Sequence, residues 1–361
     1  MEKLPDLEEN SHKKFSDWHD ILSESINTAE VLAKYLPVDI STIRKVTECY
    51  PMRINPYYLS LMINKGDHLR KQAVPDLKEI EDISGSDDPS CEERQSPVPN
   101  LTHRYPDRAL FMVSNQCALY CRFCMRKRKV GRPFTVTDST INAGMEWIRK
   151  NNTIHEVILS GGDPLLLEDD EIDRILGRLR SIKHVEIIRI HSRIPCTLPQ
   201  RITKNLADTI RQHHPLFVNT HFNHPDEITK EAAAACAILS DAGIPLGCQT
   251  VLLKGVNDTP HVMQTLMKKL LTIRIRPYYI HHPDLVRGTS HFRTTIKEGL
   301  GIIRSLHGYV SGLCVPQYMI DLPGGGGKVP LLPEYIQSVS DEKLQIENFR
   351  GEIYNYPETI V

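Results

Sequence analysis

Residues 109–124 read Ala-Leu-Phe-Met-Val-Ser-Asn-Gln-Cys-Ala-Leu-Tyr-Cys-Arg-Phe-Cys, so a short apolar run leads directly into three closely spaced cysteines. A run of this kind indicates a buried strand. Similar runs recur along the chain, at 155–160, 185–190, 216–220, 246–253 and 274–280. Helical patterns fill the gaps, near 138–150, 169–182, 200–213, 226–241, 260–272 and 290–307. Strands that alternate with helices predict a parallel sheet with helices outside it.

These six strand–helix units predict an α/β fold, a partial (β/α)6 barrel of the TIM type. They occupy roughly 200 residues, fewer than a closed eightfold barrel usually needs, and an open doubly wound sheet is the alternative. We expect an N-terminal helical arm and linker in residues 1–98, the barrel in residues 99–290 and a C-terminal segment in residues 291–361. Residues 76–100 are polar and rich in Ser, Gly, Asp and Pro, which favours a linker or surface crossing.

The composition is that of an ordinary globular protein of 361 residues, 40% of them hydrophobic and 25% charged. Its 44 basic and 45 acidic residues give a net charge of -1, whereas proteins that wrap nucleic acid usually carry a basic surplus. The longest apolar stretch, 232–239, is far shorter than the roughly 20 residues of a membrane span. The N-terminus lacks the apolar core of a secretory signal. We therefore expect a cytoplasmic protein that binds neither nucleic acid nor a membrane.

Polar side chains follow the predicted strands. Because the carboxyl ends of parallel strands lie on one face of such a fold, these side chains predict one shared site. In chain order they are the cysteine group, Gly161-Gly162-Asp163, His191-Ser192-Arg193, His221 with Asn223, Gln249, and His281-His282-Pro283-Asp284.

Cys117, Cys121 and Cys124 form a C-x3-C-x2-C pattern. Three thiolates at this spacing can hold three irons of a [4Fe–4S] cluster and leave the fourth iron without a protein ligand from the motif. A structural zinc site would need a fourth Cys or His nearby, and the sequence offers none there. The nine cysteines are too few and too scattered for a disulfide framework. Five cations flank the cysteines and are expected to offset the cluster's charge and receive small anions, with a nucleic-acid patch as the alternative: Arg122, Arg126, Lys127, Arg128 and Lys129.

Residues 322–330 read Leu-Pro-Gly-Gly-Gly-Gly-Lys-Val-Pro. A phosphate-binding P-loop is excluded because Val329, rather than Ser or Thr, follows Lys328. A flexible linker is disfavoured by the apolar residues on both sides. A mobile backbone that carries one amine suits a lysine that forms a Schiff base with pyridoxal phosphate (PLP). We expect Pro323 and Pro330 to bound the mobile part.

The position of the cysteine motif after the first strand resembles that of the radical S-adenosylmethionine (SAM) enzymes. Further stretches resemble one family among them, the PLP-dependent lysine 2,3-aminomutases, and the resemblance runs from about residue 20 to the C-terminus. They are Thr220-His-Phe-Asn-His-Pro225, Gly247-Cys-Gln-Thr-Val-Leu252, Arg276-Pro-Tyr-Tyr279 and the tetraglycine–lysine run. The resemblance implies a [4Fe–4S] cluster, SAM and PLP as cofactors.

The resemblance also assigns site residues position by position. Cys117, Cys121 and Cys124 would ligate the cluster, and Lys328 would be the catalytic PLP lysine. Arg104 and Arg108 match the PLP phosphate-binding positions, and Arg126 matches the partner of the substrate carboxylate. Asp284 and Asp321 match the pair that holds the ε-ammonium in lysine-specific members. The positions that contact SAM match Gly161, Gly162, Asp163, His221 and Gln249.

The implied activity is that of an isomerase, which moves the α-amino group of L-lysine to C3 and gives β-lysine. Reduced flavodoxin or ferredoxin would supply the electron. The alternatives are an aminomutase for another amino acid, or one whose β-lysine modifies elongation factor P. More distant alternatives are an RNA-modifying radical SAM enzyme and a non-catalytic iron–sulfur protein.

Longer members of the family bind zinc through a cysteine-rich tail and a cysteine after Gly-Val-Asn-Asp. In this chain Thr259 follows Asp258, and no cysteine follows Cys314. We therefore expect no zinc of this kind. We also expect a homodimer built partly through the N-terminal arm, rather than the family's full tetramer.

Overall fold

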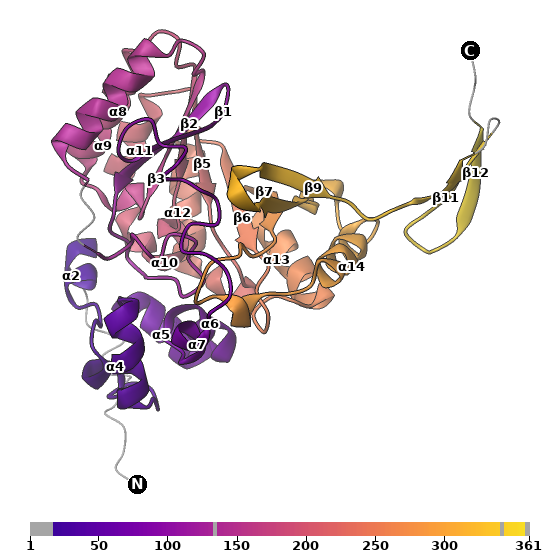
Figure 1. Cartoon of the computed structure of the whole chain (residues 1–361), viewed down its shortest axis with the longest axis horizontal. Coiled ribbons are helices and arrows are strands. Elements are labelled where there is room, and N and C mark those ends of the chain that lie inside the picture. The colour runs from indigo at the N-terminus through magenta and orange to yellow at the C-terminus, as the bar shows by residue number, and fades with distance from the viewer. Residues whose placement is uncertain (1–16, 133–135, 340–342, 358–361) are drawn as a thin grey trace.

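A computed structural model describes residues 17–132, 136–339 and 343–357. Its main sheet has the strand order β1 to β9, in sequence order (Figure 1). The strands from β2 to β8 are parallel to their neighbours, and β1 and β9 are antiparallel strands at the two ends. Their bounds are β1 Leu101–Tyr105, β2 Arg108–Ser114, β3 Glu156–Gly161, β4 Ile187–His191, β5 Leu216–Thr220, β6 Leu246–Val251, β7 Ile275–His281, β8 Gln317–Leu322 and β9 Gly327–Leu331.

The six predicted strands are confirmed, and the α/β partial barrel with them. The structure adds a further parallel strand, β8, which the sequence did not predict. Strands β8 and β9 belong to the C-terminal segment, so part of that segment completes the barrel sheet. The domain boundaries at residues 98 and 290 remain predictions.

The helices that follow the strands cover the outside of the sheet. Five of them begin after a threonine whose hydroxyl accepts a backbone N–H of the first turn, which fixes where each helix starts. Their buried aliphatic side chains join those of the strands in one continuous core. The helices are α8 Asp138–Lys150, α9 Asp169–Arg180, α11 Lys204–Arg211, α12 Lys230–Asp241, α13 Pro260–Thr272 and α14 Ile296–Leu306.

Short helices form the N-terminal arm, which packs beside the barrel (Figure 1). Its buried side chains, such as Trp18, Ile54 and Met62, belong to the same core cluster as the strands. A bridge between Ile54 and Leu119 ties the arm to the loop that carries the cysteines. The arm contains α2 Trp18–Ser23, α3 Ala29–Leu32, α4 Ile40–Cys49, α5 Pro56–Lys65, α6 Asp67–Ala73 and α7 Lys78–Glu81.

Segment 76–100 keeps many exposed residues, as expected of a surface crossing, but buried carboxylates anchor it to the body. Within this segment Glu79 and Glu92 are only 1% and 3% exposed. A buried carboxylate requires a cationic partner, so the segment is packed against charged side chains elsewhere in the chain. Those partners are described with the site below.

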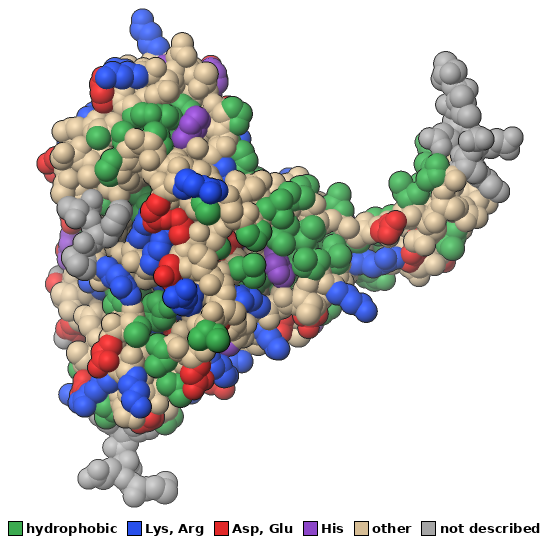
Figure 2. Space-filling view, in the orientation of Figure 1, with side chains coloured by type: hydrophobic (Ala, Val, Ile, Leu, Met, Phe, Trp, Pro, Cys, Tyr) green, Lys and Arg blue, Asp and Glu red, His purple; other side chains and the backbone are tan. Residues whose placement is uncertain are grey.

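A small antiparallel sheet projects from the body at the C-terminal end (Figure 1). It consists of β10 Ile336–Val339, β11 Lys343–Glu347 and β12 Ile353–Pro357. Apolar side chains gather on the projection (Figure 2). Among them Ile336, Val339, Ile353 and Tyr356 are exposed. In the described parts of the chain, no helix combines the length and the apolar character that a membrane crossing requires.

Candidate active site

One cavity of about 1020 Å³ opens at the carboxyl ends of the parallel strands. Every site residue predicted from the sequence lines this cavity, although the residues come from eight of the nine strands or the loops after them. They are Cys117, Cys121, Cys124, Arg104, Arg108, Arg126, Gly161, Gly162, Asp163, His221, Gln249, Asp284, Asp321 and Lys328. The volume lies at the upper end of the usual range for small-molecule sites, which is about 300–1,000 Å³. The cavity therefore has room for more than one small ligand.

The three predicted cluster cysteines lie in the loop after β2, and their thiols are free. Burial raises the pKa of the Cys117 thiol well above its usual range and that of Cys124 to about 11, and the neighbouring thiols add to both shifts. The thiolates are therefore unfavourable unless a cation balances them. A metal centre supplies that charge, and soft thiolates suit iron–sulfur clusters. Among the residues that the structure describes, no fourth cysteine lines the cavity. This donor set fits a [4Fe–4S] cluster with one open iron.

The Gly161-Gly162 turn after β3 packs tightly against the cysteine loop. A Cβ on Gly161 would lie 2.1 Å from the Ser114 carbonyl oxygen, and one on Gly162 would lie 2.3 Å from that of Gln116. Gly161 also has a φ of +129°, which side chains rarely adopt. The N–H of Gly162 donates to the Ser114 carbonyl at 2.7 Å. Glycine is therefore required for the close approach of the two loops.

Asp163 remains a predicted SAM contact, and its carboxylate organises the loop after β4. It accepts hydrogen bonds from Ser192 Oγ at 2.6 Å and from the backbone N–H of Arg193 at 2.7 Å. Burial raises the pKa of Asp163 to about 6. Because its backbone lines the cavity while its carboxylate is engaged, any SAM contact by Asp163 would come from the backbone.

Lys328 lies on strand β9, paired in register with Asp321 on β8. The glycine run forms the tight turn of this hairpin, with φ of +73° at Gly324 and +87° at Gly325. The glycines therefore serve a turn that needs left-handed backbone. The predicted mobility of this run remains a prediction. The register brings Lys328 Nζ to 2.7 Å from Asp321 Oδ2.

Two carboxylates stand beside Lys328. Asp321 is held between two cations, because Arg104 Nη1 donates to its Oδ1 at 2.8 Å. Asp284 follows β7 and is buried, and burial raises its pKa to about 6 even though Lys328 lies nearby. The neighbouring Asp321 carboxylate raises this pKa further. Because Asp321 already faces two cations, Asp284 is the carboxylate of this acidic corner that is placed to receive an additional one.

Arg104 and Arg108 both border the cavity but differ in their contacts. Besides Asp321, Arg104 donates to Gln95 Oε1 at 2.9 Å and to the Ser90 carbonyl at 2.7 Å. Arg108 donates through Nη1 to Asp107 Oδ1 at 2.9 Å and lies over the Tyr105 ring, with its guanidinium carbon 4.0 Å from the ring centroid. Arg108 is therefore the freer of the two to receive an anion from the cavity.

Arg126 makes a forked ion pair with Glu92. Its Nε and Nη2 lie 3.0 and 2.6 Å from Glu92 Oε1, and Nη1 donates to Ser160 Oγ at 3.2 Å. Burial opposes the charge on Glu92, but Arg126 and its cationic neighbours outweigh it and hold the pKa of Glu92 at about 2. Glu92 therefore fixes the guanidinium by one edge and leaves the Nη1 side for a ligand.

The remaining cations near the cysteines are also paired with segment 76–100. Arg122 and Lys127 lie 2.6 and 2.8 Å from the Glu79 carboxylate. Arg128 and Lys129 lie 2.9 and 3.0 Å from Glu93. The expectation that these cations offset the cluster's charge remains a prediction, because Glu79 faces both Arg122 and Lys127 and one carboxylate cannot balance two cations.

His221 and Gln249 lie at the ends of β5 and β6. Burial and the nearby Arg193 lower the pKa of His221 to about 3, so its ring is neutral. Its Nε2 lies 3.0 Å from Asn223 Oδ1. A neutral imidazole and an amide are suitable contacts for a ligand's polar groups.

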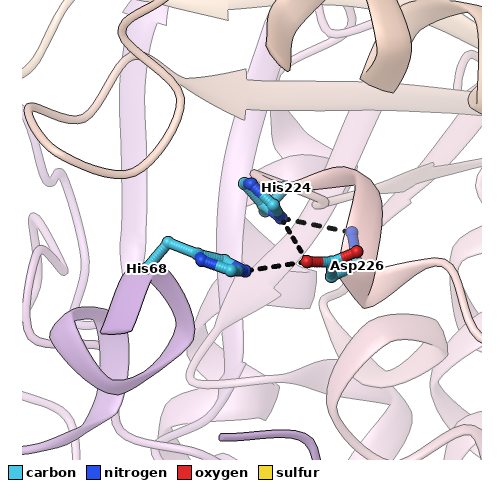
Figure 3. Close-up of side chains that lie close together, drawn as sticks. All are labelled: His68, His224 and Asp226. Carbon is cyan, nitrogen blue, oxygen red and sulfur yellow. Dashed lines mark hydrogen bonds and ion pairs between the residues drawn. The ribbon is translucent and has the colours of Figure 1, made fainter. Parts of the chain in front are cut away.

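A second polar cluster lies outside the cavity, where the arm meets the barrel (Figure 3). His68 Nε2 and His224 Nδ1 lie 3.0 and 3.5 Å from Asp226 Oδ2. The two imidazole rings lie against each other with centroids 3.7 Å apart. Two histidines on one tetrahedral zinc, with bonds of about 2.0–2.1 Å, would hold their centroids roughly 5 Å apart. These rings are therefore packed as a contact between the arm and the barrel.

Sequence reasoning missed the residues that hold the site residues in place, chiefly Glu92 and Glu227. Glu227 is fully buried and binds Arg193 at 2.8 Å. A signal for Glu92 existed: the basic run 126–129 needs counter-charges, and acidic residues cluster at 79–93. Nothing local in the sequence marks Glu227.

Comparisons with known proteins agree with the geometry. A family model described as the radical SAM superfamily matches residues 111–266, and one described as lysine-2,3-aminomutase matches residues 303–360. The L-lysine 2,3-aminomutase of Acetoanaerobium sticklandii is 47% identical over 355 residues, which cover 96% of this chain and 86% of that protein.

The glutamate 2,3-aminomutase of Clostridioides difficile is 40% identical over 346 residues, covering 93% of this chain and 82% of that protein. Among solved structures, a radical SAM methyltransferase from Sphaerobacter thermophilus matches with a TM-score of 0.44 and 15% identity, over 61% of this chain and 67% of that one. From its 47% identity to a relative along nearly its whole length, the chain belongs to the lysine 2,3-aminomutase family of radical SAM enzymes.

Proposed function

We propose that this enzyme moves the α-amino group of L-lysine to C3 and so makes β-lysine, with PLP as well as the family's [4Fe–4S] cluster and SAM. The observation that carries the proposal is the shared cavity. Three cysteines, one lysine and two aspartates, from distant parts of the chain, line a single chamber. The cluster and SAM would supply an organic radical, and PLP would hold the migrating amine.

The residues present fit PLP. Lys328 offers an amine for the aldehyde, and Arg108 offers a guanidinium for the phosphate on the same cavity wall. Arg126, fixed by Glu92, offers a fork for the substrate carboxylate. Asp284 and Asp321 lie where an ε-ammonium would be neutralised. Together these groups would bind both ends of lysine and hold its middle over the reacting centre.

The acidic corner supports lysine over glutamate as the substrate. A glutamate side chain would bring a third carboxylate beside Asp284 and Asp321, and like charges in a buried site repel strongly. Anaerobic reconstitution with iron, sulfide, PLP and SAM, followed by NMR of reactions with lysine, ornithine, arginine and glutamate, tests this preference. Turnover of glutamate in place of lysine would contradict the proposed substrate.

Replacing Asp284 by asparagine is expected to lower kcat/KM for lysine by roughly 3–5 kcal/mol, the cost of breaking a buried ion pair. Asp284 is a cleaner test than Asp321, because Asp321→Asn would also leave Arg104 and Lys328 without their carboxylate. Steady-state kinetics with lysine measures the loss, and Asp258→Asn, outside the cavity, is the matched control. A wild-type kcat/KM in Asp284→Asn would show that Asp284 does not bind the substrate's ε-ammonium.

The KM for lysine is expected to rise as the pH falls below about 6. The pKa of Asp284 is raised to about 6, so acid converts it to a neutral carboxyl that no longer attracts the ε-ammonium. For one proton the limiting slope is about tenfold per pH unit. A KM profile between pH 5 and 8 measures it, and the dependence should vanish in Asp284→Asn. A flat wild-type profile would show that Asp284 does not bind the ammonium.

A homodimer and a flavodoxin or ferredoxin as reductant belong to the same proposal. The exposed apolar side chains of the β10–β12 sheet support an interface at the C-terminal end, in addition to the expected one at the N-terminal arm. The absence of the family's tail zinc remains a prediction.

A further inference from the structure

The guanidinium of Arg193 lies against one of the three cavity cysteines. Arg193 follows β4, at the start of α10 (Ile194–Thr197), and is 8% exposed. Its Nη1 donates to the Sγ of Cys121 at 2.7 Å. A contact between an always-charged donor and a cysteine sulfur is unusual for a structural thiol, because a neutral thiol is a weak acceptor. A thiolate is a much better partner.

Several contacts hold Arg193 in this position. Its Nη2 donates to Glu227 Oε1 at 2.8 Å and to Gln72 Oε1 at 2.6 Å. Its backbone N–H donates to Asp163 at 2.7 Å. The guanidinium carbon also lies 5.2 Å from the centroid of the Phe123 ring. Because Nη2 is engaged by both Glu227 and Gln72, Nη1 is aimed at the sulfur and has little freedom to turn away.

Arg193 differs from the other cations near the cysteine motif. Arg122, Lys127, Arg128 and Lys129 are paired with Glu79 or Glu93. Arg193 also has a carboxylate partner, Glu227, but its Nη1 reaches past that partner to Cys121. Hydrogen bonds to cluster sulfurs and the net charge around a cluster set its reduction potential. A cationic donor stabilises the form with one more electron.

We propose that Arg193 is a positioning residue that donates a hydrogen bond to the Cys121 thiolate and raises the reduction potential of the cluster. Gln72 belongs to α6, so the N-terminal arm helps to hold the residue that tunes the cluster. The arm is thus part of the cluster's surroundings. The inference rests on the assignment of the cluster to Cys117, Cys121 and Cys124, which the iron content of the wild-type protein tests separately.

The test is a potentiometric titration of the reconstituted full-length protein, followed by EPR of the reduced cluster. In Arg193→Gln, the ratio of reduced to oxidised cluster at a fixed potential is expected to fall about tenfold, equivalent to about 59 mV for one electron. Arg193→Lys keeps the charge but lacks the forked guanidinium, so its ratio of reduced to oxidised cluster should fall by less. Iron and sulfide content per chain should match the wild type in both variants.

Arg53→Gln is the matched control. Arg53 also lies beside the cysteine loop, but its Nη1 donates to the carbonyl of Cys117 at 3.2 Å rather than to a sulfur. In Arg53→Gln, the ratio of reduced to oxidised cluster should stay within about twofold of the wild-type value, because Arg53 makes no bond to a cluster sulfur. An unchanged potential in Arg193→Gln with a full cluster would overturn the proposal. Loss of the cluster in both Arg193 variants, with native circular dichroism, would overturn it too, since Arg193 would then be needed to hold the cluster.

Discussion

Lys328→Ala is expected to lose aminomutase activity by on the order of 10³-fold or more, the scale of removing a residue that reacts covalently. Lys328 is the amine that lines the cavity between the two aspartates, and an alanine leaves PLP without its covalent attachment. The loss should fall on kcat, because Arg126 and Asp284 would still bind lysine.

A second readout separates loss of attachment from loss of folding. Treatment of the PLP-loaded wild type with borohydride should fix the coenzyme to the peptide that contains residue 328, as seen by mass spectrometry. Lys328→Ala should give no such adduct, whereas the exposed control Lys297→Ala should give the wild-type one. Covalent PLP on another lysine of the wild type would refute the assignment.

Cys124→Ala is expected to abolish SAM cleavage and to reduce the iron bound after reconstitution to a small fraction of the wild-type value. A cubane with only two protein thiolates loses a ligand that tunes and retains it. Iron analysis and the visible absorbance of the cluster measure the effect.

Cys236→Ala is the appropriate control for this substitution. Cys236 is also fully buried, but it lies on α12 and does not border the cavity. The Cys236→Ala protein should bind iron and cleave SAM as the wild type does. A Cys124→Ala protein with a complete cluster would show that this thiol is not a ligand.

The strands and helices of the barrel could be predicted because their apolar residues repeat with clear periods. Strand β8, Gln317–Leu322, could not be predicted with the same clarity. It lies directly before the glycine run, and its apolar residues show no separate strand pattern. The hairpin turn at Gly324 and Gly325 could not be predicted, since glycine is permissive and sequence alone does not show which glycines adopt left-handed backbone.

The site residues could be predicted from spacing and resemblance, but their supporting partners could not. Glu92 meets Arg126 across 34 residues, and Glu79 meets Arg122 across 43. Such pairs depend on how the chain returns to the same place, which local composition does not record. For that reason the sequence of segment 76–100 resembles that of a linker, although Glu79 and Glu92 within it are buried counter-ions.

The ion pair between Lys328 and Asp321 has a consequence for the order in which the enzyme is loaded. Lys328 ends in the same ammonium group as free lysine. Without coenzyme, its ammonium therefore occupies the position beside Asp321 that the ε-ammonium of the substrate would take. Under the proposed function, PLP must bind the Lys328 amine first. Asp321 then becomes available to the ε-ammonium of the substrate. An excess of lysine supplied before PLP should therefore slow activation of the apoenzyme.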